Sequence, residues 1–96
     1  MFESITEQII EKYAPEKILL FGSQAKNKAK AKSDIDLCIV METNNKRQLL
    51  AELYYTIQSE KPIDIILYTP AEWNECIKDS TSFAYKIQKE GILLYG

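Results

Sequence analysis

The sequence predicts a small α/β protein in which helices flank a mixed β-sheet. Apolar runs of strand length, at 17–21, 35–41 and 63–68, alternate with segments whose apolar residues recur at helical spacing. Of the 96 residues, 46% are hydrophobic and 27% are charged, which is typical of a globular protein. A chain of this length is expected to form one domain over residues 1–96.

The first helix is expected near the start of the chain. Ser4 and Glu7 have the spacing of a capping box, and the helix must end before Pro15 because a residue that precedes proline disfavours helical geometry. Its apolar face is formed by Ile5, Ile9, Ile10 and Tyr13.

Two strands and a long connection follow. The run 17–21 is almost entirely apolar, as in a central strand that is covered on both faces. Gly22 then turns the chain, and a short helical turn is expected from Ser23 to about Lys28. A lysine-rich loop leads into the second strand, 35–41.

The middle of the chain predicts a helix and a third strand. Asn44 or Asn45 can cap the helix, which is expected to end near Glu60. Pro62 then precedes the strand 63–68. The helix residues expected to pack on the sheet are Leu49, Leu50, Leu53, Tyr54 and Ile57.

The last third predicts two helices and an edge strand. Thr69 and Glu72 form a capping box around a proline at the first helical position, and Trp73 is expected to face inward. A second helix is expected over 82–90, with Gly91 as a left-handed cap. The apolar residues 92–95 are then expected to add an edge strand.

Composition excludes several kinds of function. Histidine is absent, which removes Ser-His and Cys-His nucleophiles and leaves carboxylates as the main catalytic resource. Cys38 and Cys76 fit neither a disulfide framework nor a zinc motif, so both are expected to be reduced packing residues. No apolar run has the length of a signal peptide or a membrane span, and a cytoplasmic protein is therefore expected.

The net charge of −2 makes a dedicated nucleic-acid binder improbable. Lysines alternate through the long connection, at positions 26, 28, 30 and 32, and together with Lys46 and Arg47 they could form a basic rim. The favoured interpretation is a solvated loop.

Three aspartates carry the functional interpretation. Asp34 and Asp36 project to the same side of a strand, roughly 6.5 Å apart along the backbone. Asp64 interrupts the apolar run 63–68, and a buried carboxylate costs several kcal/mol unless a cation or hydrogen bonds compensate. If the two strands are neighbours, about 4.8 Å apart, the three carboxylates can converge. Carboxylate oxygens are the ligands that Mg²⁺ prefers, and the Gly22-Ser23 turn offers N–H groups to phosphate.

Gly22-Ser23, a gap of ten residues, Asp34-Ile35-Asp36, and Asp64 on the next strand resemble the minimal nucleotidyltransferases of the DNA polymerase β superfamily. The resemblance implies the polymerase β-like fold and metal-dependent transfer of a nucleoside monophosphate, usually from ATP, to a hydroxyl. Two Mg²⁺ ions would be held by Asp34, Asp36 and Asp64, with Asp64 as third ligand or base.

The resemblance also implies how the nucleotide and a partner are bound. The nucleotide would contact Gly22, Ser23, Gln24 and Lys26. Small members of the family are commonly antitoxins of all-helical HEPN-domain toxins, and some adenylylate a tyrosine of the toxin. A HEPN toxin is therefore the expected partner, in a hetero-oligomer, because 96 residues leave no room for an added acceptor domain.

One difference from the family keeps alternatives open. Many relatives have arginine where this chain has Gln24, so a guanidinium that could hold phosphate is replaced by a neutral amide, and Lys26 or Lys28 could substitute. This difference favours a non-catalytic antitoxin that blocks its partner sterically. Transfer to a small molecule or an RNA end is the third alternative.

Overall fold

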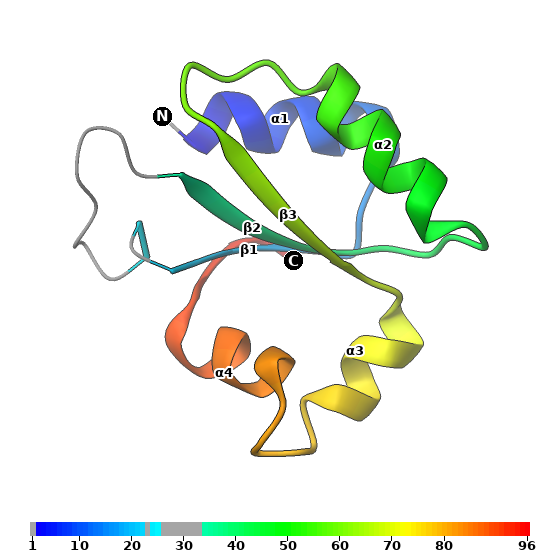
Figure 1. Ribbon diagram of the computed structural model, residues 1–96, viewed down its shortest axis with the longest axis vertical. Coiled ribbons are helices and arrows are strands. Elements are labelled where there is room, and N and C mark those ends of the chain that lie inside the picture. Colours follow the sequence, from blue (N-terminus) through cyan, green and yellow to red (C-terminus); the bar gives the residue numbers. More distant parts are fainter. Residues whose placement is uncertain (1, 23, 26–33) are drawn as a thin grey trace.

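The computed structural model describes residues 2–22, 24–25 and 34–96 and shows a four-stranded sheet between helices (Figure 1). The elements follow the predicted order: α1 (Phe2–Tyr13), β1 (Lys17–Phe21), β2 (Ile35–Val40), α2 (Lys46–Thr56), β3 (Ile63–Tyr68), α3 (Pro70–Cys76), α4 (Phe83–Glu90) and β4 (Ile92–Tyr95). Ser23 and Lys26, and most of the helical turn expected from Ser23 to Lys28, lie outside the described residues.

The sheet is mixed, as predicted, with the strand order β3-β2-β1-β4. β1 runs antiparallel to both β2 and β4, whereas β2 and β3 are parallel. A parallel pair needs a crossover connection, and α2 supplies it. The expected edge strand at 92–95 is confirmed, and β3 forms the other edge.

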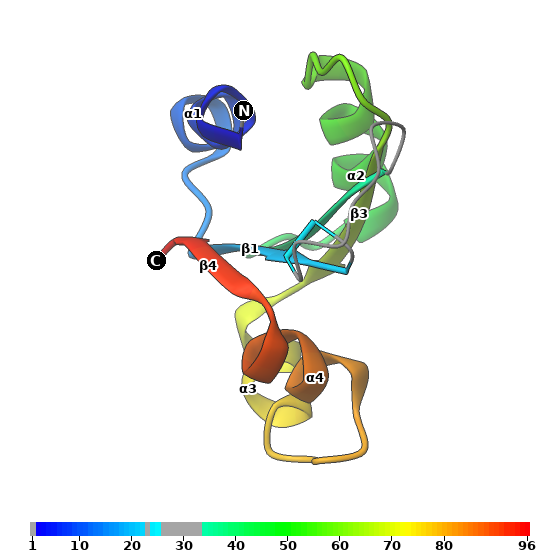
Figure 2. The ribbon, with the colours of Figure 1, turned by 90° about the vertical axis from the view of Figure 1, so that its left-hand side faces the viewer.

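The helices form a layer on each side of the sheet, with α1 and α2 on one face and α3 and α4 on the other (Figures 1 and 2). Each face has its own hydrophobic cluster. In β1, Ile18 and Leu20 belong to the cluster under α1 and α2, while Leu19 belongs to the cluster over α3 and α4. The prediction that 17–21 is a central strand is therefore confirmed.

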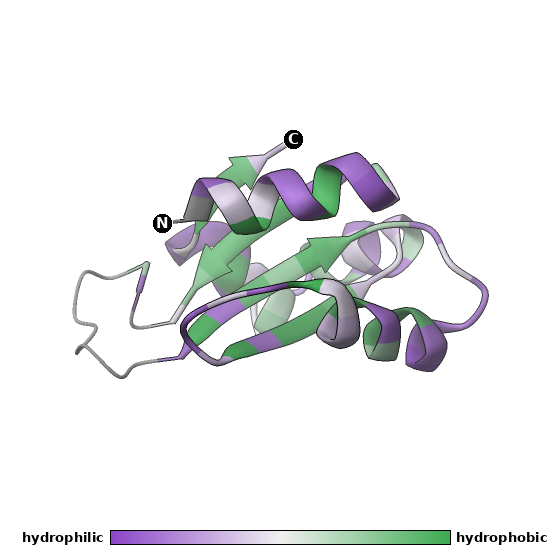
Figure 3. Cartoon of the chain, turned by 90° about the horizontal axis from the view of Figure 1, so that it is seen from above, coloured by the Kyte–Doolittle hydropathy of each residue, from purple (hydrophilic) through white to green (hydrophobic). Residues whose placement is uncertain are grey.

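Hydropathy follows this layering. The strands are hydrophobic along most of their length, and the helices α1 and α2 turn hydrophilic residues outward (Figure 3). On these two helices the side chains that reach the sheet include Ile5, Ile9, Leu49 and Leu53. Among the described helices, none combines the length and the apolar character that crossing a bilayer requires.

Three helices have side-chain caps, of which those at Asn45 and Thr69 were predicted. The side chain of Asn45 accepts a hydrogen bond from the N–H of Gln48 at the start of α2. Thr69 and Glu72 form a complete capping box on α3, and Ser82 caps α4. Each cap satisfies a backbone N–H that the first turn of a helix leaves without an intrahelical partner.

Two expected helix ends were wrong. Ser4 is not a cap, because α1 begins at Phe2. The helix expected to reach Glu60 ends at Thr56. The chain leaves α2 early because Gln58 is held on α1: its N–H donates to the side-chain oxygen of Gln8, and its carbonyl accepts from the Gln8 amide.

The expected left-handed cap at Gly91 was also wrong. Gly91 has φ −80 and ψ 175, since the chain passes directly from α4 into the extended backbone of β4. Space rather than conformation requires a glycine here, because a Cβ would lie 2.5 Å from the carbonyl oxygen of Ile87. Among the described residues other than glycine, only Ala14 has a positive φ, of 49°, directly after α1.

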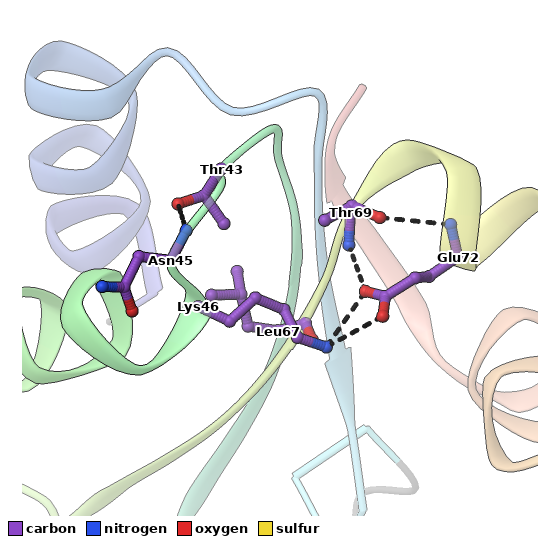
Figure 4. Close-up of polar contacts among 6 residues, drawn as sticks. All are labelled: Thr43, Asn45, Lys46, Leu67, Thr69 and Glu72. Carbon is purple, nitrogen blue, oxygen red and sulfur yellow. Dashed lines mark hydrogen bonds and ion pairs between the residues drawn. The ribbon is translucent and has the colours of Figure 1, made fainter.

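A polar contact joins the start of α2 to the start of α3 (Figure 4). The Lys46 ammonium donates to Glu72 Oε1 at 3.0 Å and to the carbonyl of Leu67 at 3.4 Å. Glu72 Oε1 also accepts the N–H of Thr69 at 2.9 Å. This backbone hydrogen bond, followed by the one from Lys46, lowers the pKa of Glu72.

The contact also shows that Lys46 does not contribute to a basic rim around the aspartates, which the sequence left possible. Leu67 lies three positions beyond Asp64 on β3, roughly 10 Å further along the strand. Lys46, and with it Arg47, is thus at the end of the sheet remote from the aspartates. The lysines at 26, 28, 30 and 32 lie outside the described residues.

Candidate active site

Strand register places two of the three aspartates side by side. Asp36 on β2 pairs with Asp64 on β3 in the parallel ladder, and Phe21 on β1 pairs with Asp36 in the antiparallel ladder. Residues paired in register point to the same face of a sheet. This face carries Cys38 and Val40 further along β2, which are buried in the cluster with α3 and α4.

Asp34 joins the pair from the residue before β2. A hydrogen bond with the Asp64 carboxyl raises the pKa of Asp34, and the desolvation of Asp34 and the charge of Asp64 act in the same direction. The pKa of Asp36 is also raised, first by partial burial and then by the charges of Asp64 and Asp34. Each of these carboxyl groups therefore interacts with another of the set, as the sequence predicted.

The expectation that Asp64 is a buried carboxylate was wrong. Asp64 is exposed, because β3 is an edge strand and its next two residues on this face, Ile66 and Tyr68, are only partly buried. Of the three carboxylates, Asp36 on the inner strand is the partly buried one. An open carboxylate at a sheet edge is accessible to another molecule, so the exposure of Asp64 suits a site that meets an acceptor.

Gly22 lies directly against Asp36. Its φ is +74°, in the region that favours glycine, and a Cβ built on it would lie 2.3 Å from Asp36 Oδ2. The Asp36 carboxylate thus occupies the space that any larger residue at position 22 would need. Gln24 lies in the turn that follows and is partly buried.

The donor chemistry of this site fits a hard divalent cation, because all three side chains are carboxylates. Within the described residues, no group of three or more acidic, cysteine or histidine side chains is gathered closely enough to hold a metal ion. The carboxyl groups have different neighbours: that of Asp34 is hydrogen-bonded to Asp64, whereas that of Asp36 lies against Gly22. After the hydrogen bond at Asp34 and the burial of Asp36, repulsion from neighbouring carboxylates also raises both pKa values, and a bound cation would relieve that repulsion.

The cysteines take no part in the site. Burial raises the pKa of the Cys38 thiol to about 12, so it stays protonated and unreactive. Cys38 and Cys76 are both free, and both contribute to the cluster between the sheet and α3 and α4. The prediction that they are reduced packing residues is confirmed.

No local pattern in the sequence predicted the aromatic pair beside Gly22. Phe21 and Phe83 meet edge to face, with ring centroids 5.5 Å apart. They are 62 positions apart in the chain, and each alone resembles an ordinary core residue. Only the packing of α4 on β1 brings them together.

Comparison with known proteins agrees with this geometry. A family model described as polymerase beta, nucleotidyltransferase matches residues 3–96, which is nearly the whole chain. The chain belongs to this nucleotidyltransferase family. Membership supports nucleotidyl transfer as the general role of the domain, and it supports a nucleoside triphosphate and a divalent metal as the ligands that such a domain generally uses.

A solved structure supports the fold of this nucleotidyltransferase domain. A candidate nucleotidyltransferase from Sulfolobus solfataricus superposes with a TM-score of 0.64 at 20% sequence identity, covering 95% of this chain and 73% of the other. At that identity the likeness concerns the fold alone. The predicted polymerase β-like fold is therefore confirmed. No curated protein matches the sequence significantly.

Proposed function

We propose that the protein transfers AMP from ATP to a hydroxyl group of a partner protein in a Mg²⁺-dependent reaction, and that it acts as the antitoxin of a HEPN-domain toxin. The observation that carries this proposal is the position of Asp36, which lies in register with Asp64 and against Gly22, together with the hydrogen bond between Asp34 and Asp64. The family membership of the chain supports the reaction class.

In this proposal each residue has a role. Asp34, Asp36 and Asp64 would hold two magnesium ions, and Gly22, Ser23, Gln24 and Lys26 would contact the triphosphate. When bound, the ions would stabilise the attacking and leaving oxygens of an in-line displacement. The pKa values of Asp34 and Asp36 are raised, so these carboxyls are partly protonated at acidic pH and would have to lose protons when a cation binds. At neutral pH they are ionised and cation binding would release fewer protons.

In the proposed transfer the acceptor oxygen forms a bond to the α-phosphorus, the bond from the α-phosphorus to the bridging oxygen breaks, and pyrophosphate leaves. Asp64 either completes the ligands of the ion that lowers the pKa of the acceptor hydroxyl or itself accepts the proton of that hydroxyl. Its exposure on the edge strand supports this role, because a hydroxyl carried by another chain can reach it.

Labelled ATP tests the proposal. The protein is incubated with Mg²⁺, ATP labelled on the α-phosphate and the product of the neighbouring gene. Label on the neighbour is expected with the parent and is expected to be lost with Asp36→Asn. Glu75→Gln is the matched control, since Glu75 is exposed on α3 and forms its ion pair with Lys78, away from the three aspartates. Transfer that persists in Asp36→Asn contradicts the proposed chemistry.

A second candidate is a non-catalytic antitoxin that blocks its partner sterically. Two observations favour it: Gln24 replaces an arginine that many relatives carry, and Asp34 is hydrogen-bonded to Asp64 rather than poised for a metal. Calorimetry with the partner separates the two. If a triple variant with Asn at 34, 36 and 64 binds and neutralises the partner as well as the parent does, binding alone suffices.

A further inference from the structure

A small cavity lies next to the acidic site, on the side of Gly22 that faces α4. Its volume is about 170 Å³, and its walls include Phe21, Gly22, Phe83, Lys86 and Ile87. Gly22 therefore borders both the cavity and the Asp36 carboxylate, which lies against the same residue. A ligand that extends from the Asp36 carboxylate past Gly22 would reach this cavity.

The walls of the cavity suit a flat aromatic ring. Phe83 is 48% exposed although it meets Phe21 edge to face, so part of its ring is open to a ligand. Ile87 is 2% exposed and forms an apolar floor, while Lys86, an exposed residue with an ammonium donor, also lines the cavity. Aromatic side chains stack on nucleobases of any sequence because every base has a π-face.

The size of the cavity limits its occupant. Pockets for drug-sized ligands have volumes of roughly 300–1,000 Å³, so about 170 Å³ suits one ring system and not a larger molecule. The base of a nucleoside triphosphate is such a ring system, and the ribose joins it to phosphates that would lie at the Gly22 turn.

We propose that this cavity binds the base of the nucleoside triphosphate, with Phe83 as the stacking platform and Lys86 as a donor to the edge of the base. The proposal rests on the nucleotidyl transfer proposed above and adds the base subsite to it. Phe83 and Lys86 then determine how tightly the base is held, whereas the carboxylates and the Gly22 turn hold the phosphates and the cation.

The test compares ATP with inorganic tripolyphosphate, which has no base, by calorimetry in the presence of Mg²⁺. We expect the parent to bind ATP more tightly than tripolyphosphate. Phe83→Ala should weaken ATP binding on the order of tenfold to a hundredfold, the usual effect of losing one stacking side chain, and leave tripolyphosphate binding unchanged. Phe83→Leu, which retains apolar volume but no ring, should likewise weaken ATP binding and leave tripolyphosphate binding unchanged.

Tyr55→Ala is the matched control, because Tyr55 is an aromatic residue on α2 that is 91% exposed. It should bind both ligands as the parent does, and thermal melting should show that all variants are folded. Equal weakening of both ligands in the Phe83 variants, an unchanged ATP affinity, or an equal loss in Tyr55→Ala overturns the base site. The base site is also overturned if the parent protein binds ATP no more tightly than tripolyphosphate. Failure of the parent to bind either ligand instead refutes the proposed function, and the base site with it.

Discussion

Replacement of Gly22 by alanine tests whether the turn and the Asp36 carboxylate form one unit. Gly22 has φ +74°, and an alanine in the left-handed region costs roughly 1–2 kcal/mol. A domain of this size loses about 4–8 °C in Tm for each kcal/mol, so the backbone term alone predicts a decrease of roughly 4–16 °C. The added Cβ would also lie 2.3 Å from Asp36 Oδ2, so the carboxylate must turn away.

The displacement of Asp36 has a separate consequence for cation binding. A cation that binds the folded protein raises its Tm in proportion to the logarithm of its concentration above Kd. In the parent, Mg²⁺ should raise the Tm, and in Gly22→Ala this response should be reduced because one of the three carboxylates has moved. Thermal melts at a series of Mg²⁺ concentrations measure both effects.

Gly91→Ala is the matched control for this experiment. Its added Cβ would meet two backbone oxygens, Ile87 O at 2.5 Å and Leu20 O at 2.8 Å, so it should also lower the Tm. It touches none of the three carboxylates, and its Mg²⁺ response should equal that of the parent. The reasoning is refuted if Gly22→Ala melts at the parent temperature, or if it keeps the full Mg²⁺ response.

Three further outcomes are expected. The pKa of Asp34 is raised above its ordinary value of 3.8, so the protonated carboxyl stabilises the fold below that pH, and this stability is lost as the pH rises through the raised pKa. Asparagine cannot ionise, so Asp34→Asn should melt at a higher temperature than the parent at pH 7 without Mg²⁺. The difference should vanish near pH ~3, where the aspartate is also neutral. Thr69→Ala removes the α3 cap and should cost about 1 kcal/mol in urea unfolding, while Thr69→Ser should cost little; an equal loss in both variants would contradict the capping role. Leu53→Ala should lower the free energy of unfolding by roughly 2–5 kcal/mol because Leu53 is fully buried. The exposed control Tyr55→Ala should change it by no more than about 0.5 kcal/mol, and an equally small effect of Leu53→Ala would show that the surrounding side chains collapse into the cavity.

Sequence reasoning located the elements well where local signals were strong. The apolar runs identified all three early strands, and Asn45 and Thr69 act as the caps that their positions predicted. These features depend on a few neighbouring residues, so a local pattern is enough to predict them.

The misplaced ends depended on contacts between distant segments. α2 stops at Thr56 because Gln8 on α1 holds the backbone of Gln58, fifty positions away. Gly91 stays in extended backbone because β4 pairs with β1 immediately afterwards. Neither partner is adjacent in sequence, so a local pattern could not have revealed either contact.

The candidate site shows the same division. Spacing alone identified Asp34, Asp36 and Asp64, and the prediction that they interact depended on β2 and β3 being neighbours. The sequence suggested that Asp64 is the costly buried carboxylate, but the structure gives that position to Asp36. Burial depends on which strand lies at the edge, and strand order is a property of the whole sheet.

By itself, the sequence determined the kind of chemistry, because the absence of histidine and the spacing of glycine and aspartate are written in the order of the residues. It also determined the order of helices and strands, since hydrophobic periodicity acts over a few residues. Only the tertiary structure decided which carboxylate is exposed, that Asp36 fills the space over Gly22, and that Phe21 and Phe83 line a cavity beside it. The physical reason is that burial, electrostatic repulsion and ring packing arise between groups that meet only when the sheet and its two helical layers assemble.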